Sequence, residues 1–409
     1  MIKFCKYVLM GLIALFLSGQ NAVMTSALSH SVTNGSQEIQ SAMQLGSKKK
    51  EEQARTINHV RLIGSYNLPH EMTYKGTVVG GFSGITYNPY NNKWLIISDD
   101  RSAHNPARFY EARMNYNSRD IQKIRFVDVN YLKQSDETVY PNKNQYLNGA
   151  DGIVLDPESI RFDPMDCSIW YTSEGDRSLG LDPLVHQATP NGGFLSELPL
   201  TGTIKMDEQN ERDFRNNLAL EGSTFSADGK TYWTAMEGPL LQDDSIPTTR
   251  SGSLSRITQY DRNGNTLGEY AYPIDAIPEQ PGEGKHADNG VTEILAINDQ
   301  ELLVLERASI QAEDGSFSND ISVYKINVNG ATDISSMETI DKENINPLQK
   351  ELAVNLNTLG LDKVDNVEAM SWGKKLPNGN ETLILVSDNN FNRSQITQII
   401  AVEVIPDNK

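Results

Sequence analysis

Cysteine is almost absent from this chain of 409 residues, which contains only Cys5 and Cys167. Because Cys5 lies in a segment that we expect to be removed, Cys167 is the single cysteine of the expected mature chain. A disulfide framework within the mature protein is therefore not expected. The fold must depend on a hydrophobic core, and one closed domain of about 350 residues is large enough to bury one.

Positive charge is also scarce, with 36 Lys and Arg against 54 Asp and Glu and a formal net charge of −18. Loss of Lys3 and Lys6 with residues 1–27 would change this to −18 − 2 = −20. Such an acidic chain argues against nucleic acid or an anionic membrane as a partner, and it suits divalent cations.

Several common catalytic motifs are missing. The sequence has no phosphate-binding glycine loop, no zinc motif of Cys or paired His, no EF-hand loop and no Gly-x-Ser-x-Gly nucleophile motif. The chemistry has to come from residues that are far apart in the chain.

The N-terminus differs from the rest of the chain. Lys3 and Lys6 precede an apolar run from Tyr7 to Leu17 that is too short to span a membrane, and small and polar residues follow it. We therefore predict a signal peptide at 1–27, a flexible linker at 28–56 and one domain at 57–409. The mature protein is expected in the periplasm or outside the cell, without a membrane anchor.

One pattern occurs five times: a polar or acidic residue opens an apolar strand, a turn follows, and a second strand ends in an acid. The five copies run from Ser83 to Asp99, Glu158 to Glu174, Glu221 to Glu237, Glu293 to Glu306 and Glu368 to Asp388. Their starts are separated by 75, 63, 72 and 75 residues. Each unit has room for about four short strands, which is typical of a propeller blade.

We therefore predict an all-β fold, a single β-propeller with five blades by motif count, six being the alternative. Turn formers such as Asn88 and Asp163 make each copy a hairpin. Only one long strand, Ile396 to Ile405, follows the last hairpin. The segment from His59 to Tyr66 is expected to pair with it and to close the ring.

The repeated acids are expected to meet, because equivalent positions of the innermost strands surround the channel of a propeller. Glu158, Glu221, Glu293 and Glu368 would form one level, which Ser83 completes. The closing acids would gather at one mouth of the channel: Asp99 or Asp100, Glu174, Glu237, Glu306 and Asp388. Crowded carboxylates are suited to hard divalent cations, of which Ca²⁺ is our first expectation.

Arginine follows the closing acid in four copies, at Arg101, Arg177, Arg307 and Arg393. One interpretation is a lattice of salt bridges that ties the blades together. The other is that these arginines bind the anionic group of a substrate, because guanidinium matches phosphate bidentately.

Histidines stand beside some of these acids, at His104, His186 and His286. A single loop histidine is usually only a solvated side chain, but these three together on one face could supply a general acid or extra metal ligands. The catalytic candidates are therefore Glu158, Glu221, His104 and His286.

The motifs also carry a resemblance to a known family. They include Phe82-Ser83-Gly84-Ile85 with Ser98-Asp99-Asp100-Arg101, Asp156-Pro157-Glu158-Ser159-Ile160 with Ser173-Glu174-Gly175, Leu220-Glu221-Gly222, Thr292-Glu293 with Leu305-Glu306-Arg307, and Val367-Glu368 with Ser387-Asp388-Asn389-Asn390-Phe391. In this order they resemble the phytase-like family described as having esterase-like activity. The resemblance covers roughly residues 60–405 and implies a secreted or periplasmic β-propeller that hydrolyses phosphate or other esters.

The leading hypothesis is an exported, metal-dependent hydrolase of an ester, first of all a phosphoric ester, with a small anionic or ester substrate. One alternative is a non-catalytic binding propeller that grips a partner with loops at 101–108, 176–196 and 238–253. Another is a lactonase or sugar-oxidising propeller with one metal. A closed ring leaves few exposed strand edges, so a monomer is expected.

Overall fold

The computed structural model describes residues 55–207 and 212–406. The predicted signal peptide, Cys5 and residues 28–54 of the predicted linker lie outside the described residues. Within the described ranges, no helix is both long and apolar enough to cross a membrane.

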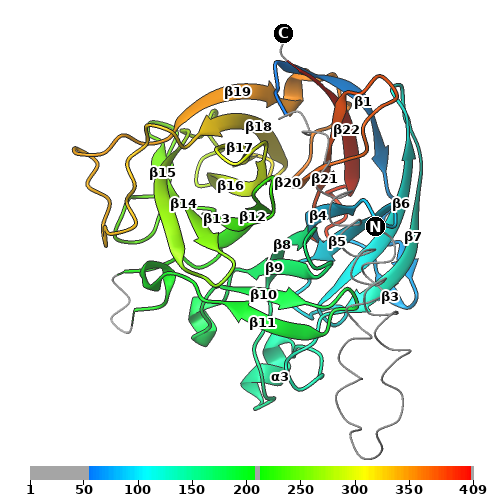
Figure 1. Cartoon of the computed structure of the whole chain (residues 1–409), viewed down its shortest axis with the longest axis horizontal. Helices are drawn as coiled ribbons and strands as arrows, with labels where there is room; N and C mark the ends of the chain where they lie inside the picture. The colour runs from blue at the N-terminus through cyan, green and yellow to red at the C-terminus, as the bar shows by residue number, and fades with distance from the viewer. Residues whose placement is uncertain (1–54, 208–211, 407–409) are drawn as a thin grey trace, which may run out of the picture. The chain divides into compact units, whose positions relative to one another are not determined.

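Five four-stranded antiparallel sheets surround a central axis, as Figure 1 shows. The first blade is β4 (Phe82–Asn88), β5 (Lys93–Ser98), β6 (Arg108–Tyr116) and β7 (Ile121–Tyr131). The second is β8 (Pro157–Phe162), β9 (Ile169–Ser173), β10 (Leu184–Ala188) and β11 (Phe194–Leu198). The third is β12 (Leu220–Phe225), β13 (Thr231–Met236), β14 (Ser253–Asp261) and β15 (Thr266–Ile274). The prediction of a propeller is confirmed.

The fourth blade is β16 (Ala287–Ala296), β17 (Glu301–Gln311), β18 (Phe317–Asn327) and β19 (Gln349–Asn355). The fifth is β20 (Val367–Trp372), β21 (Glu381–Ser387), β22 (Gln398–Ile405) and β1 (His59–Asn67). β1 pairs antiparallel with β22, from His59 opposite Ile405 to Asn67 opposite Gln398. The predicted closure of the ring by its two terminal strands is therefore confirmed, and the blade count is five.

The hydrophobic core lies between neighbouring blades. Trp94 and Ile96 of the first blade, for example, share a cluster with Ile384 and Val386 of the fifth. The inner strands β8 and β12 are buried along their whole length, because each has a blade on either side. These strands are held rigidly, and so are the side chains that they present to the channel.

The predicted turn residues close the inner hairpins by local hydrogen bonds. The Asn88 side chain accepts from the backbone N–H of Tyr90 at 3.0 Å, and the Asp163 side chain accepts from the N–H of Met165 at 2.8 Å. Side chains of Asn and Asp commonly stabilise turns in this way. The hairpin prediction is confirmed at these positions.

The inner hairpin of every blade contains a β-bulge in its first strand. The residues that fall in the register shift are Ser83, Glu158 with Ser159, Glu221 with Gly222, Thr292, and Glu368. A bulge changes the direction of a side chain and is frequent next to functional sites. Four of the five opening positions are therefore as predicted, and the fourth blade differs.

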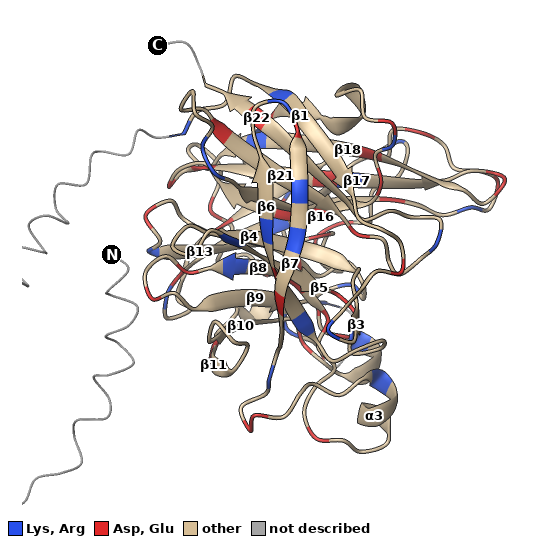
Figure 2. Ribbon diagram, turned by 90° about the vertical axis from the view of Figure 1, so that its right-hand side faces the viewer, with Lys and Arg blue, Asp and Glu red and all other residues tan. Residues whose placement is uncertain are grey.

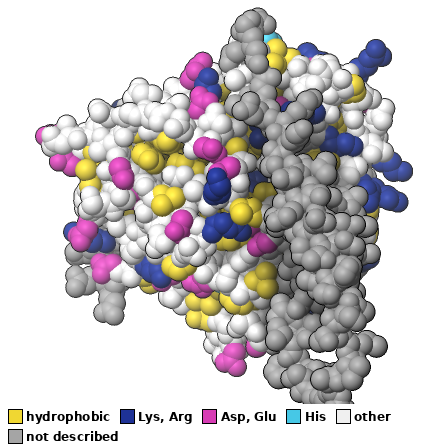
Figure 3. Space-filling view, viewed as in Figure 1, with side chains coloured by type: hydrophobic (Ala, Val, Ile, Leu, Met, Phe, Trp, Pro, Cys, Tyr) yellow, Lys and Arg dark blue, Asp and Glu magenta, His cyan; other side chains and the backbone are white. Residues whose placement is uncertain are grey.

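Loops and short elements cover the ring. They include β2 (Thr73–Tyr74), β3 (Thr77–Val78), α3 (Lys143–Leu147), η1 (Arg177–Leu179), η2 (Gly202–Ile204) and η3 (Leu356–Thr358). The segment 176–196, expected as a single loop, contains strand β10 and the start of β11. Both signs of charge occur on strands and loops in Figure 2, and hydrophobic side chains visible in Figure 3 lie scattered among polar ones.

Candidate functional site

Eight carboxylates gather where the inner hairpins open at one mouth of the channel. They are Asp99, Asp156, Glu158, Glu174, Glu221, Glu237, Glu368 and Asp388, and each interacts electrostatically with at least one other member. Asp99 and Glu368 are half-buried and the other six are buried. We call this group the mouth cluster.

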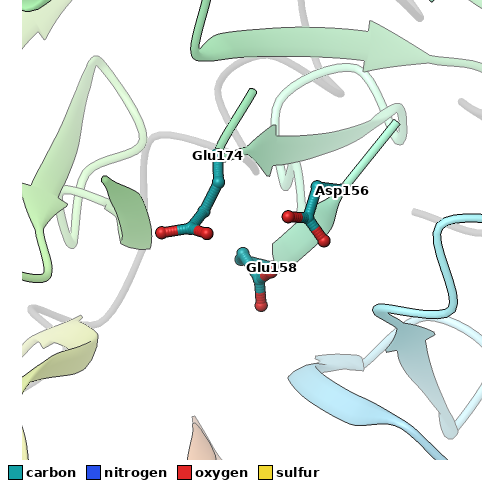
Figure 4. Close-up of side chains that lie close together, drawn as sticks. All are labelled: Asp156, Glu158 and Glu174. Carbon is teal, nitrogen blue, oxygen red and sulfur yellow. The ribbon is translucent and has the colours of Figure 1, made fainter. Parts of the chain in front are cut away.

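Two sets of three carboxylates within the mouth cluster lie especially close together. Asp156, Glu158 and Glu174 each offer an oxygen within 4.8 Å of the others, and so do Glu174, Glu221 and Glu237. Figure 4 shows the first set converging from the start of β8 and the end of β9. Glu174 belongs to both sets, so the two oxygen-rich sites are adjacent.

Burial and mutual repulsion shape the electrostatics of this group. Burial, reinforced by the neighbouring Glu221 and Asp156, raises the pKa of Glu158 well above its usual value. Burial followed by repulsion from Glu237 does the same for the pKa of Glu221. A carboxylate out of water and beside other carboxylates loses solvation and gains repulsion when it ionises. Without a counter-charge, burial and repulsion therefore favour the protonated form of both groups.

Other members of the mouth cluster are shifted in the same direction. Burial is again the main cause, and it raises the pKa of Asp156 to about 6, of Glu237 to about 7 and of Asp99 to about 8. Asp388 is fully buried, and burial together with the charges of Asp99 and Glu368 raises its pKa well above the usual range. Titration of the mouth cluster therefore extends across neutral pH.

Two arginines reach into the mouth cluster. The Arg101 guanidinium lies 2.5 Å from Asp156 Oδ2 and 4.0 Å from Glu174 Oε2. Arg307 donates to Glu237 Oε1 at 2.8 Å and lies 3.4 Å from Glu368 Oε1. Burial opposes the charge of both guanidinium groups, but the surrounding carboxylates outweigh it and raise their pKa. Two guanidinium groups cannot neutralise eight carboxylates.

The fourth blade departs from the predicted register by one residue at both ends of its inner hairpin. Val291 pairs with Glu306 and Glu293 pairs with Leu305, so Thr292 lies in the bulge and Arg307 directly follows the residue paired just before the bulge. A shift of one residue turns a side chain to the opposite face of a strand. Our placement of Glu293 and Glu306 on the same levels as the other acids is therefore wrong, because Thr292 and Arg307 occupy those positions.

Glu306 instead contacts the outer strands of the third and fourth blades. It accepts a hydrogen bond from the Tyr272 hydroxyl at 2.5 Å and one from the Asp275 N–H at 3.1 Å, and it forms an ion pair with Lys350. These partners satisfy its buried charge locally. The structure thus places Glu306 in a contact that holds blade four to the end of β15.

Glu293 lies deeper in the channel and pairs with Arg161. Their side chains are 2.6 Å apart, and both are almost completely buried. The Arg161 guanidinium also donates to backbone carbonyl oxygens in all four other inner strands, those of Ile85, Ser223, Ile294 and Met370. We call this Arg161–Glu293 pair the channel floor, because it joins all five blades below the mouth.

Three other predicted residues lie apart from the mouth cluster. Asp100 forms a buried ion pair with Arg108 and accepts from the backbone of His104 and Asn105. Arg177 pairs with Asp213 at 3.1 Å, and the exposed Arg393 pairs with Glu71 at 2.6 Å. Of the alternatives at the first blade, it is Asp99 that faces the other acids.

The histidines have different surroundings. The His104 ring packs on Phe391 with ring centroids 4.5 Å apart, and the exposed His286 lies 2.8 Å from Asp288. Asp288 in turn interacts electrostatically with Arg307. His186 is buried in the second blade, where its ring lies within hydrogen-bond distance of Tyr140 and Tyr171, so it does not belong to the mouth cluster.

Sequence reasoning missed three residues with defined roles here. Asp156 precedes Glu158 by two positions within the segment that begins the second copy, and it completes one carboxylate set. Arg161 stands between Ile160 and Phe162 in the strand that Glu158 opens, and a charged residue between two large apolar ones was the available signal for a buried ion pair. Nothing in the sequence pointed to Asp288. Its contact with Arg307 depends on the pairing of β16 with β17, which the sequence does not show.

The fold and this site define a five-bladed propeller with a buried acidic mouth. The chain belongs to the phytase-like family, described as "Esterase-like activity of phytase", which matches residues 77–391. The resemblance inferred from the motifs is thereby confirmed. No curated protein matches the chain.

The solved structures that match the chain do so at low identity. A thermostable family-43 glycoside hydrolase has 12% identity and a TM-score of 0.39, over 80% of this chain and 91% of its own. The catalytic domain of the GH62 α-L-arabinofuranosidase of Coprinopsis cinerea has 8% identity and a TM-score of 0.39, over 86% and 97%. A glucose dehydrogenase has 9% identity and a TM-score of 0.34, over 84% and 99%. At these scores the likenesses bear on neither substrate nor mechanism.

Proposed function

We propose that this protein is an exported hydrolase of phosphoric esters that depends on divalent cations, with Ca²⁺ as the first candidate. The observation that carries the proposal is the excess of carboxylates at the mouth, where two sets of three share Glu174 and only two arginines oppose eight acids. A lattice built only for stability would balance its charges. This excess calls for a cationic partner.

The donor set suits a hard cation. All the grouped ligands are carboxylate oxygens, which Ca²⁺ and Mg²⁺ prefer, and they are held on rigid inner strands. Asp156, Glu158 and Glu174 would hold one ion, and Glu174, Glu221 and Glu237 a second. Bound cations would neutralise the carboxylates and polarise the phosphoryl oxygens of a substrate.

The protein's own groups supply binding and proton transfer. Arg101 and Arg307 lie on opposite sides of the cluster in the first and fourth blades, and their guanidinium groups can turn from their carboxylates to a phosphate. Glu158 or Glu221 would accept a proton from the attacking water as the bond from phosphorus to the ester oxygen breaks. His286, oriented by Asp288, would give a proton to the departing alkoxide, so that alcohol and phosphate are released.

His104, Arg177 and Arg393 have smaller parts in this proposal. His104 stands at the rim beside Phe391 and could contact a bound substrate, whereas Arg177 and Arg393 already pair with acids outside the mouth cluster. The substrate is a small anionic ester. We expect a monomer in the periplasm or outside the cell, with no binding to nucleic acid or membrane.

The test compares two glutamates that look equivalent in sequence. Glu221→Gln removes a carboxylate from the mouth cluster, whereas Glu293→Gln removes one from the channel floor. Hydrolysis of 4-nitrophenyl phosphate would be measured with Ca²⁺ and after chelation. Activity that requires the cation, is abolished in Glu221→Gln and persists in the folded fraction of Glu293→Gln would support the proposal.

The binding propeller remains the alternative from another class, and one observation favours it: both mouth arginines are already paired with acids. It predicts no turnover of 4-nitrophenyl phosphate or 4-nitrophenyl acetate and no change in thermal midpoint on chelation. A lactonase or sugar-oxidising propeller would instead act on uncharged rings and tolerate loss of Arg101 or Arg307. Either result would overturn the phosphoric ester proposal.

A further inference from the structure

A recess of about 580 Å³ lies beside the mouth cluster, between the fourth and fifth blades. Arg307 lines it, so the recess and the mouth share a side chain. Its other walls come from β16, β17, β18 and the loops that precede β20 and β22. A group attached to a phosphate at Arg307 would extend into this space.

The lining is polar and carries unused hydrogen-bonding groups. The side chains of Ser309, Asn319, Asn390 and Gln395 line the recess, and none of them hydrogen-bonds to a described residue. Amide and hydroxyl side chains both donate and accept hydrogen bonds. The recess therefore offers partners of both kinds, as a ligand with several hydroxyl groups requires.

Each cation of the recess already has an acid beside it. Lys363 lies 2.7 Å from Asp365, and His286 lies 2.8 Å from Asp288. Arg307 is held by Glu237 and Glu368 in the mouth cluster. A polyanion in this space would find no excess positive charge. The recess thus favours a neutral ligand over one with several phosphates.

An exposed aromatic ring completes the lining. Phe317, at the start of β18, is 51% exposed although large apolar side chains are mostly buried in this ring of blades. An aromatic side chain gives a rigid apolar surface at little cost in conformational entropy. It can cover the C–H face of a ring or chain whose hydroxyl groups meet the amides opposite.

We propose that this recess binds a neutral polyhydroxylated group, a sugar or polyol, as the alcohol part of the substrate. The assignment of that group as part of a substrate rests on the proposed function, whereas its binding does not. His286 lines the recess as well, so the alkoxide that leaves would form within reach of a proton donor. The recess would then decide which phosphoric esters are cleaved.

Direct binding tests the recess without relying on catalysis. D-Glucose, D-galactose, maltose and D-glucitol would be titrated against the mature protein by ligand-observed NMR, with tripolyphosphate as the polyanionic probe. We expect millimolar binding of at least one neutral compound, weakened about tenfold by Phe317→Ala and by Gln395→Ala. Tyr90→Ala is the matched control, because Tyr90 is an exposed aromatic residue, 40% exposed, outside the recess lining.

The outcomes separate this proposal from the previous one. No binding of any neutral compound, equal binding by Phe317→Ala and the wild type, or tighter binding of tripolyphosphate that Gln395→Ala weakens would overturn it. If hydrolysis occurs, Phe317→Ala should lower kcat/KM for glucose 6-phosphate relative to 4-nitrophenyl phosphate by about fivefold. Absence of hydrolysis with sugar binding intact would overturn the enzyme proposal alone.

Discussion

The mouth and the floor of the same channel are built from the same residue types, yet their charges are arranged in opposite ways. At the floor, one guanidinium meets one carboxylate, and its remaining N–H groups reach the backbone carbonyls of four other strands. At the mouth, eight carboxylates face two guanidinium groups. Buried charge is tolerated when it is paired and hydrogen-bonded, and it is costly otherwise.

This contrast separates structure from function within one ring. The floor resembles another buried one-to-one pair in the protein, that of Arg108 with Asp100 in the first blade. The mouth cannot be explained in the same way, because its acids destabilise the fold unless they bind protons or cations. We therefore assign the stabilising salt bridges to the floor and the blades, and the candidate chemistry to the mouth.

The largest expected effect concerns the floor. Arg161→Met should lower the free energy of unfolding by about 3 to 5 kcal/mol, because it leaves Glu293 buried without its partner and frees four carbonyl groups. Urea denaturation would measure the loss. The double variant Arg161→Met with Glu293→Gln should lose less than the sum of the single variants, and a strictly additive result would contradict a direct pairing.

The next prediction concerns the shared ligand of the mouth. Glu174→Gln should reduce hydrolysis about a hundredfold, equivalent to about 2.7 kcal/mol, and weaken Ca²⁺ binding by about tenfold, since both carboxylate sets lose a charge. Calorimetric titration and the cation-dependent thermal midpoint would report the binding. Glu306→Gln is the control, because Glu306 lies off the mouth cluster. An unchanged Ca²⁺ affinity in Glu174→Gln would place the cation elsewhere.

A third prediction uses pH. In the cation-free protein, burial raises the pKa of Asp156 to about 6, of Glu237 to about 7 and of Asp99 to about 8. The folded state therefore holds protons that the unfolded state releases near pH 4, and stability should fall by an amount on the order of several kcal/mol as pH rises from 4 to 8. Saturating Ca²⁺ should flatten this decline. Thermal midpoints across this range with and without Ca²⁺ would show it, and a cation-free midpoint that rises with pH would contradict the assignment.

The smallest effect is expected at the surface. Arg393→Ala removes an exposed pair with Glu71, so the thermal midpoint should not change measurably and hydrolysis should stay at the wild-type rate. Arg101→Ala, by contrast, should raise the KM for a phosphoric ester. Equal effects of the two substitutions on KM would show that proximity to the mouth is not what matters.

The repeated pattern in the sequence was enough to predict most of the fold. Openers such as Glu158 and Glu368, turn formers such as Asn88, and the spacing between copies predicted five blades and the pairing of the two terminal strands. Local patterns suffice for this because strand, turn and strand are decided within about twenty residues. The same repeat also located six of the eight acids in the mouth cluster as first choices, and Asp99 as one of two.

The tertiary structure alone decided which charged residues meet. Glu221 and Glu293 both stand at the expected spacing in the sequence. The bulge in the fourth blade falls at Thr292, however, so the Glu293 side chain lies at the channel floor. Likewise Arg307, rather than Glu306, enters the mouth. A shift of one residue leaves the pattern of strand and turn intact while it reverses the face that each side chain presents. The sequence by itself thus determined the ring and its supply of acids, and pairing between strands determined which acids remain unbalanced.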